Sequence, residues 1–272
     1  MPDVTEDPDV TEDLVALWTA LDARFAHATP VRWGAVVTDR RFPDVWDANY
    51  ARVEIADEQL SLAEVAHALD PAIARADAAA FHVVMFRPQG CTRLLAELGS
   101  RGDRLSWDVV MCRAPDAREV SLGGPGDVQE LPPDRELWER VGSSMASFGV
   151  TEPEIVRQLL RIEREVMEPG TSKRWFGVRD DRGRIVTLAA LVLLAGSAYV
   201  DHVVTFPEAR GRGYARAAVT RLVHEARASG ALRTFLLVDP AGPLPLYERL
   251  GFREVTRIAS TLAIRQTAGG GR

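Results

Sequence analysis

Apolar residues in the first half of this chain recur at two different spacings. Apolar positions three or four residues apart predict helices, and alternation or a short continuous apolar run predicts strands. On this basis we expect helices over residues 14–25, 60–76 and 91–98 and strands over residues 31–38, 81–86 and 104–112. A loop with aromatic side chains is expected over residues 42–50, and Pro71 is a point at which the second helix could break.

The second half of the chain shows a further run of elements after an expected linker at residues 114–117. It begins with a short strand near Arg118. The same spacings then predict helices over 133–148 and 152–167, strands over 173–178, 185–194 and 198–205, a helix with apolar positions from 215 to 226, a strand over 234–239, a short helix over 243–250 and a final strand from about 250. Helices and strands therefore alternate along the whole chain.

The segment between residues 203 and 216 combines the end of a strand, a glycine-rich loop and the start of a helix. The first turn of a helix leaves backbone N–H groups without partners, and these groups favour negative charge. Gly211 and Gly213 allow the backbone to approach a bulky anion closely. Arg210, Arg212 and Arg216 add positive charge. This chemistry predicts a site for a pyrophosphate, although a simple glycine-containing turn between a strand and a helix would leave the same local pattern.

Two common phosphate loops do not fit this segment. The P-loop requires a Lys-Ser or Lys-Thr pair after its glycines, and the dinucleotide fingerprint requires a third glycine where Arg216 stands. What remains is R-x-x-G-x-A, formed by Arg210, Gly213 and Ala215. A second motif follows at Tyr247, in the stretch Leu246-Tyr247-Glu248-Arg249-Leu250-Gly251-Phe252.

Together the two motifs resemble the GNAT superfamily of N-acetyltransferases, which combine a Q/R-x-x-G-x-G/A pyrophosphate loop with a Y-x-x-x-G-F ending. The resemblance covers about residues 118–265. It implies an α/β (α+β) fold with a mixed, mostly antiparallel sheet flanked by helices, and acetyl-CoA as cosubstrate. No metal is expected, because the five histidines are scattered.

The resemblance also assigns residues to acetyl-CoA. The strand before the loop is expected to pair with pantetheine through Val203, Val204 and Thr205. The pyrophosphate would bind the loop and helix start, which comprise Arg210, Gly211, Arg212, Gly213, Tyr214, Ala215 and Arg216. Asp239 is expected to contact the cofactor, although many family members have Asn at that place.

Two side chains are candidates for proton transfer. The phenol of Tyr247 could return a proton to the leaving thiolate, or Tyr247 could be a core residue with a satisfied hydroxyl. Asp201 is expected to share a strand face with Val203 and Thr205 and to act as the base, or only to bind the substrate ammonium. His202 would then lie on the opposite face as a structural residue.

The acceptor side is less specified by sequence. In this fold it is built from the first two helices and neighbouring strands, and an aromatic and acidic lining would suit a cationic amine. The residues expected there are Trp138, Met145, Phe148, Glu152, Glu154 and Trp175. Helical aromatic residues such as these are also ordinary core residues.

A loose internal repeat relates the two halves. The run Phe81–Phe86 followed by Leu94–Gly99 parallels Phe235–Val238 followed by Leu246–Gly251, and this register places Leu95 where Tyr247 stands. We expect two GNAT-like domains in tandem: a degenerate or accessory N-terminal domain over residues 1–115, without a pyrophosphate loop, and an acetyl-CoA-binding domain over residues 116–272. An unrelated N-terminal α/β domain is the alternative.

Composition and charge argue against several classes of partner and location. A net charge of −6 and a pI of about 5.5 argue against nucleic acid as a partner. The longest apolar run, residues 185–195, is too short to span a membrane, and two cysteines make no disulfide framework. We expect a cytoplasmic protein that is a monomer or homodimer, with residues 1–9 and 269–271 lacking order.

The sequence therefore predicts transfer of an acetyl group from acetyl-CoA to a primary amine, expected to be on a small molecule. Two alternatives remain open at this point. One is a catalytically silent module that binds acyl-CoA and regulates, and the other is an acetyltransferase acting on protein lysines or N-termini. In each case the N-terminal half is expected to be a structural partner.

Overall fold

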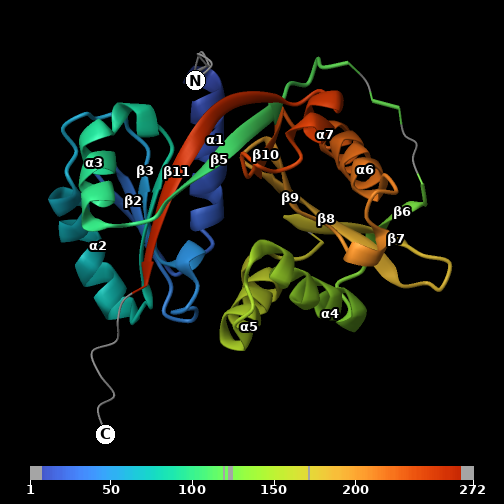
Figure 1. The fold of residues 1–272 in the computed structure, drawn as a ribbon, viewed down its shortest axis with the longest axis horizontal. Coiled ribbons are helices and arrows are strands. Elements are labelled where there is room, and N and C mark those ends of the chain that lie inside the picture. Colours follow the sequence, from blue (N-terminus) through green and yellow to red (C-terminus); the bar gives the residue numbers. More distant parts are fainter. Residues whose placement is uncertain (1–7, 119, 122–124, 171, 265–272) are drawn as a thin grey trace, which may run out of the picture. The chain divides into compact units, whose positions relative to one another are not determined.

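The computed structural model describes residues 8–118, 120–121, 125–170 and 172–264, and these form two compact units (Figure 1). Unit 1 comprises Met1–Ala20 and Val109–Thr256, and unit 2 comprises Leu21–Asp108 and Arg257–Arg272. These units differ from the predicted linear domains 1–115 and 116–272, because each unit takes its terminal segment from the other half of the chain.

Unit 2 is a sheet covered by two helices. Its strands are β1 (His27–Val31), β2 (Gly34–Thr38), β3 (Tyr50–Val53), β4 (Ala80–Met85) and the end of β11 (Arg253–Ile264), in that order across the sheet. Neighbours are antiparallel except for the parallel pair β3 and β4. Helices α2 (Leu62–Ala76) and α3 (Thr92–Arg101) contribute Val65, Leu69 and Leu94 to a core that also holds Val53 and Met85 from the strands.

Unit 1 is also a sheet covered by helices, and it has more strands than unit 2. Across its sheet lie the end of β5 (Leu105–Arg113), β10 (Arg233–Val238), β9 (Ser197–Thr205), β8 (Ile185–Leu194), β7 (Lys173–Arg179) and β6 (Val128–Leu131). Only β9 and β10 are parallel. The helices are α1 (Pro8–Asp22), α4 (Arg135–Ser144), α5 (Pro153–Arg161), α6 (Tyr214–Ala228) and α7 (Leu244–Arg249). Short turns of helix cover Met145–Phe148, Ile162–Val166 (a π-helix) and Pro207–Ala209.

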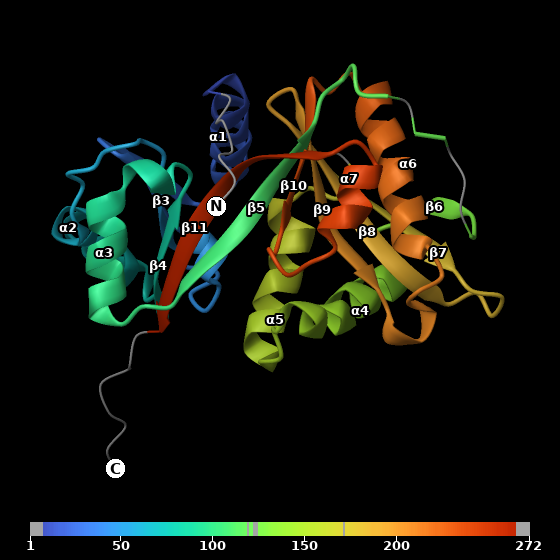
Figure 2. The same cartoon turned by 45° about the horizontal axis from the view of Figure 1, so that its top comes forward.

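The side chains of β7 and β8 alternate between two cores, which places helices on both faces of this sheet (Figure 2). Phe176 and Leu191 pack with α6 and α7, whereas Trp175 and Leu188 pack with α4. Because both faces are covered, β8 is apolar along its length rather than alternating, as the sequence indicated.

Several predicted elements needed correction. The single strand expected over 31–38 is a hairpin of β1 and β2 that turns before Gly34, where an added Cβ would lie 2.1 Å from the carbonyl oxygen of Arg52. The expected aromatic loop ends in a strand, β3. Pro71 lies inside α2 without breaking it. Residues 118, 120 and 121 form no strand. Pro8 and Asp9, which were predicted to lack order, begin α1, and the rest of the predicted disorder, residues 1–7 and 269–271, lies outside the described residues.

The internal repeat is visible in the order and length of the elements. The offset that carries Leu62 at the start of α2 onto Tyr214 at the start of α6 also carries Ala76 onto Ala228 at their ends. The same offset carries the start of α3 onto the start of α7. Each unit thus contains antiparallel strands, a helix, a parallel strand and a second helix.

The strand that follows each second helix pairs in the other unit. Strand β5 follows α3 of unit 2, but its residues Val109–Arg113 pair with β10 of unit 1. Strand β11 follows α7 of unit 1, but Ala259–Ile264 pair with β4 of unit 2. The two halves of the chain have therefore exchanged strands.

This exchange predicts that a fragment starting at Asp116 is unstable. It lacks β5, and the side chains of Val109 and Met111 on that strand are fully buried in the core of unit 1. Removing two such side chains withdraws roughly 3–6 kcal/mol of apolar burial, a large share of the stability of an ordinary domain. We expect a fragment starting at Val109 to unfold at a higher temperature in circular dichroism. Equal midpoints for the two fragments would contradict the role of β5.

Candidate functional site

Strands β9 and β10 pair only at their beginnings. The last pair in register is Tyr199 with Phe235, and beyond it β9 continues to Thr205 while β10 continues to Val238. Among the described residues no other strand pairs with this edge of β9. The edge that includes Val203, Val204 and Thr205 therefore offers backbone donors and acceptors to an extended ligand. This is the place at which the sequence predicted pantetheine to lie.

A bulge interrupts β9 opposite β8. Ala190 faces Asp201 and Leu188 faces Val204, so two residues, His202 and Val203, lie opposite Ala189. His202 takes a φ of 53°, in the left-handed region that is uncommon for residues other than glycine, although Asn, Asp and His adopt it more often than most. The bulge breaks the simple alternation from which Asp201, Val203 and Thr205 were expected to share one face.

The loop after β9 has the features of an anion site. Gly211 and Gly213 have φ values of 75° and 83°, and no side chain caps α6. Among the described residues, none accepts a hydrogen bond from the backbone amides of residues 211–216, which include the first turn of α6. Arg212 and Arg216 are exposed and form no ion pair within the described part of the chain. Arg210 instead donates from Nε to the Thr205 carbonyl at 3.0 Å and braces the loop.

The corresponding place in unit 2 is closed. Strands β3 and β4 stay paired up to Val53 and Met85, so this parallel pair does not diverge as β9 and β10 do. The hydroxyl of Ser61 accepts from the Glu64 amide at 3.2 Å and caps α2. Unit 2 therefore lacks both the open strand edge and the uncapped helix start.

Tyr247 lies on α7 in the same core as α6 and β10. Its side chain is 7% exposed, and its ring meets Phe252 edge-on at 6.2 Å. The hydroxyl makes no hydrogen bond to the described residues. Burial raises the pKa of this hydroxyl, so the group keeps its proton at neutral pH. The offset between the repeats places Leu95 at this position in unit 2.

Asp201 is held in a buried ion cluster. The ammonium of Lys173, at the start of β7, lies 2.7 Å from Asp201 Oδ2 and 2.7 Å from Glu163 Oε1 in the π-helical turn. Burial disfavours the charge on Asp201, but Lys173 and, to a smaller extent, His202 together outweigh it and hold the pKa of that carboxyl below its usual range. Burial raises the pKa of Glu163 despite the same lysine. A carboxylate stabilised in this way is a weak proton acceptor, which favours the alternative that Asp201 binds rather than deprotonates.

Asp239 uses one carboxylate oxygen in a local turn. Its Oδ1 accepts from the Ala241 amide at 2.7 Å just after β10. The residue is exposed, and its second oxygen remains available to a ligand. The expected contact with a cofactor stays a prediction.

The residues expected at the acceptor side divide into two groups. Phe148 and Trp175 both contact the His202 ring, with centroids 4.8 and 5.0 Å away, and Trp138 meets Trp175 edge-on. Phe148 is 52% exposed, whereas Met145 is buried. Glu152 is exposed and Glu154 is half-buried, and Glu154 pairs with Arg157 on its own helix. Sequence reasoning did not single out Ser144, Glu163 or Lys173, and it treated His202 as a structural residue.

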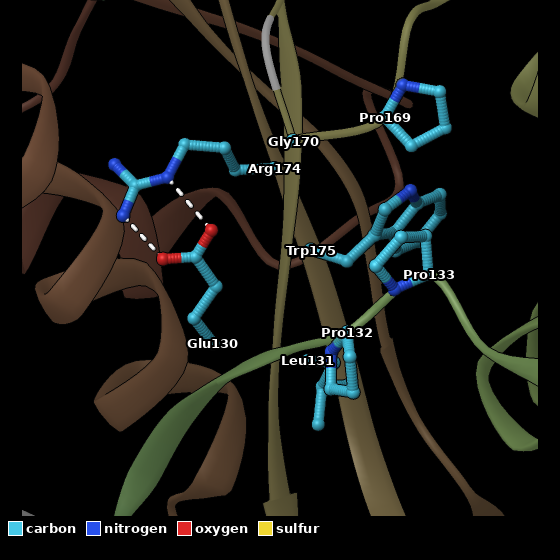
Figure 3. A pocket seen from close by; sticks show the side chains of 8 residues that line it. All are labelled: Glu130, Leu131, Pro132, Pro133, Pro169, Gly170, Arg174 and Trp175. Carbon is cyan, nitrogen blue, oxygen red and sulfur yellow. Dashed lines mark hydrogen bonds and ion pairs between the residues drawn. The ribbon is translucent and has the colours of Figure 1, made fainter.

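A cavity of about 290 Å³ lies where β6 ends beside β7 (Figure 3). Its lining includes Pro132, Pro133, Pro169 and Trp175, and also Arg174 and Glu130, whose ion pair lies across the strand from Trp175 (Figure 3). None of the residues predicted to bind acetyl-CoA lines it. Trp175 belongs both to this cavity and to the contacts around His202.

The lowered pKa of His202 predicts how the free energy of unfolding depends on pH. Burial lowers its pKa to about 4 from an ordinary value of 6.5, so the unfolded chain binds a proton in this window and the folded chain does not. Stability should therefore fall as pH drops from 6.5 to 4, by at most about 3 kcal/mol from this group. We expect His202→Gln to reduce that slope in urea unfolding at several pH values. An unchanged slope would contradict the assignment, and His67→Gln on exposed α2 surface is the control.

One family model matches part of the chain. Residues 143–252 match the model of the acetyltransferase (GNAT) family. No curated protein matches the sequence.

The described residues contain no group of three His, Cys, Asp or Glu side chains placed to hold a metal ion. No helix within the same residues is long and apolar enough to cross a membrane.

Solved structures with this fold include proteins that match nearly the whole chain. A GCN5-related N-acetyltransferase from Kribbella flavida is 17% identical, covers 96% of each chain and has a TM-score of 0.68. A tandem GNAT protein from the clavulanic acid biosynthesis pathway is 14% identical, covers 97% of each chain and has a TM-score of 0.55. A GNAT-family protein from Novosphingobium aromaticivorans is 25% identical over 60% of this chain and 66% of its own, with a TM-score of 0.44.

Proposed function

We propose that this chain, whose residues 143–252 carry a domain of the GNAT acetyltransferase family, transfers the acetyl group of acetyl-CoA to a primary amine on a small molecule. The predicted GNAT fold is confirmed, and acetyl transfer from acetyl-CoA is the general activity of that family. The proposal adds the acceptor class and the roles of individual residues.

One observation carries the proposal: β9 and β10 diverge directly beside a helix start whose amides have no partners among the described residues. A pyrophosphate on those amides, with Arg212 and Arg216 nearby, would direct the attached pantetheine along the open edge of β9. Gly213 allows the close approach because it has no Cβ. Unit 2 has neither feature, so we propose that one acetyl-CoA binds per chain, in unit 1.

The thioester would then lie near the bulge of β9. A backbone N–H at the open edge, in the segment Val203–Thr205, could donate to the thioester oxygen and stabilise the charge that develops when an amine attacks. Holding both reactants in this arrangement lowers the entropic part of the barrier. Tyr247, protonated at neutral pH, would supply the proton for the departing thiolate sulfur.

An amine screen tests the proposal. The full chain is mixed with acetyl-CoA and a library of small amines that includes polyamines, amino-acid derivatives and amine-containing antibiotics, and released thiol is measured. We expect enzyme-dependent thiol release with at least one acceptor and formation of its N-acetyl product by mass spectrometry. Acetyl-CoA binding without release for any small amine would overturn the proposal. Release with lysine peptides alone would reassign the acceptor to protein.

A further inference from the structure

The imidazole of His202 is held in one defined tautomer by Ser144. Ser144 Oγ lies 2.7 Å from the Val141 carbonyl and 2.6 Å from His202 Nε2. A hydroxyl has one proton, and the carbonyl can only accept, so the Ser144 proton goes to Val141. The short contact to the ring then requires that Nε2 carries the proton and donates it to Ser144. In a neutral ring this leaves Nδ1 with a free lone pair.

The surroundings keep the ring neutral. The side chains of Trp175 and Phe148 pack around the imidazole. Burial lowers the pKa of His202, and the Lys173 ammonium also disfavours a second positive charge, although Asp201 acts in the opposite sense. Glu163 faces Lys173 rather than the ring. No described residue makes a hydrogen bond to Nδ1, and His202 is only half-buried, so this nitrogen is open to a ligand.

The backbone conformation of His202 is also unusual. His202 adopts its left-handed φ of 53° at the bulge of β9, immediately beside the strand edge that is open to pantetheine. A non-glycine residue in this conformation is strained by about 1–3 kcal/mol, and such strain is concentrated at functional sites. Asp201, its neighbour, is tied to Lys173 by an ion pair, whereas no described residue makes a hydrogen bond to His202 Nδ1. The histidine is therefore the better-placed proton acceptor of the two.

We propose that His202 is a catalytic residue whose Nδ1 takes the proton from the acceptor ammonium, with Ser144 as the positioning residue that fixes the tautomer. This inference rests on the proposed acetyl transfer. The ammonium N–H bond breaks, its proton moves to Nδ1, and the neutral amine forms a C–N bond with the thioester carbon. The C–S bond then breaks, the sulfur takes the Tyr247 proton, and the second amine proton returns to Tyr247. His202 releases its proton to solvent, so one proton is produced for each amide formed.

The first test reads the tautomer without any substrate. The full chain is labelled with ¹⁵N-histidine, and the His202 signals are identified by their loss in His202→Gln. We expect a proton on Nε2 and none on Nδ1 at pH 7. In Ser144→Ala we expect a mixture of the two tautomers. A wild-type ring protonated on Nδ1 would overturn the proposal.

The second test separates proton removal from structural support. Methylamine is an ammonium ion at pH 7 and needs a base, whereas hydroxylamine is already neutral and does not. We expect His202→Gln to lower the enzyme-dependent rate of thiol release with methylamine by about 100-fold, since positioned bases contribute 10²–10⁴-fold, and to leave the enzyme-dependent rate with hydroxylamine within about twofold, after subtraction of the uncatalysed reaction. Equal losses with both acceptors would indicate a structural role and refute the assignment.

A matched control uses the same substitution elsewhere in unit 1. His224 lies on α6, with its Nε2 2.6 Å from the Val120 carbonyl, and His224→Gln should leave both rates unchanged. If the wild-type chain releases thiol with no amine of the screen, these two included, the proposed acetyl transfer itself fails and this role fails with it. That outcome is distinct from a loss confined to the His202 variant.

Discussion

Replacing Gly213 by aspartate is expected to weaken acetyl-CoA binding by about 100-fold, because charge-assisted hydrogen bonds contribute about 1.5–3 kcal/mol each. The substitution places a carboxylate beside amides of the α6 start that have no partner in the described chain. An added Cβ would lie 3.4 Å from Pro125 Cδ, so the fold has room for the change. The result would be read by isothermal titration calorimetry with acetyl-CoA.

Gly230→Asp is the matched control for this variant. Gly230 has a φ of 73°, close to the 83° of Gly213, so both substitutions carry a similar backbone strain. It follows the end of α6, and no atom lies within 4 Å of its added Cβ. We expect Gly230→Asp to bind acetyl-CoA as the wild type does, with the same shift in unfolding temperature as Gly213→Asp. Unchanged affinity in Gly213→Asp would show that this loop does not hold the pyrophosphate.

Replacing Tyr247 by phenylalanine is expected to lower kcat by about 100-fold or more, since a positioned acid contributes 10²–10⁴-fold. The ring and its contact with Phe252 are retained, and only the hydroxyl that makes no hydrogen bond to the described residues is lost. Acetyl-CoA affinity should change little. Single-turnover kinetics with an accepted amine would measure the chemical step directly.

Tyr199→Phe provides the comparison for the loss of a hydroxyl in the same unit. Tyr199 lies on β9 with its ring 5.2 Å from Trp18 of α1. We expect the kcat of Tyr199→Phe to stay near the wild-type value. Wild-type chemistry in Tyr247→Phe would eliminate Tyr247 as the acid and leave it as a core residue.

Local sequence was sufficient for the features that depend on backbone conformation and short-range periodicity. Gly211 and Gly213 have positive φ values, and glycine is the residue that adopts them without strain. Strand β8 spans Ile185–Leu194, the range predicted from its continuous apolar run. The start of α6 directly after Gly213 is likewise a local property, because the apolar spacing that follows it is helical.

The two strand exchanges could not be predicted in this way. The apolar residues of β5 and β11 indicate that each strand is partly buried, but they do not name the strand with which each pairs. Pairing depends on where the rest of the chain places the two sheet edges. A linear boundary at residue 115 was therefore the natural prediction, and the tertiary structure replaced it with two units that exchange segments.

The chemistry around β9 was also decided by tertiary structure. Strict alternation put His202 on the structural face, and one bulge opposite Ala189 turned it toward Ser144 and Phe148. A lysine at the start of a strand is ordinarily solvated. Lys173 is instead buried, and its ammonium pairs with the carboxylates of Glu163 and Asp201. The sequence alone determined the two glycine conformations and the helix start at the proposed pyrophosphate loop, because these depend on neighbours along the chain. Which side chains face the acceptor depends on contacts between segments far apart, and only the folded chain determined those.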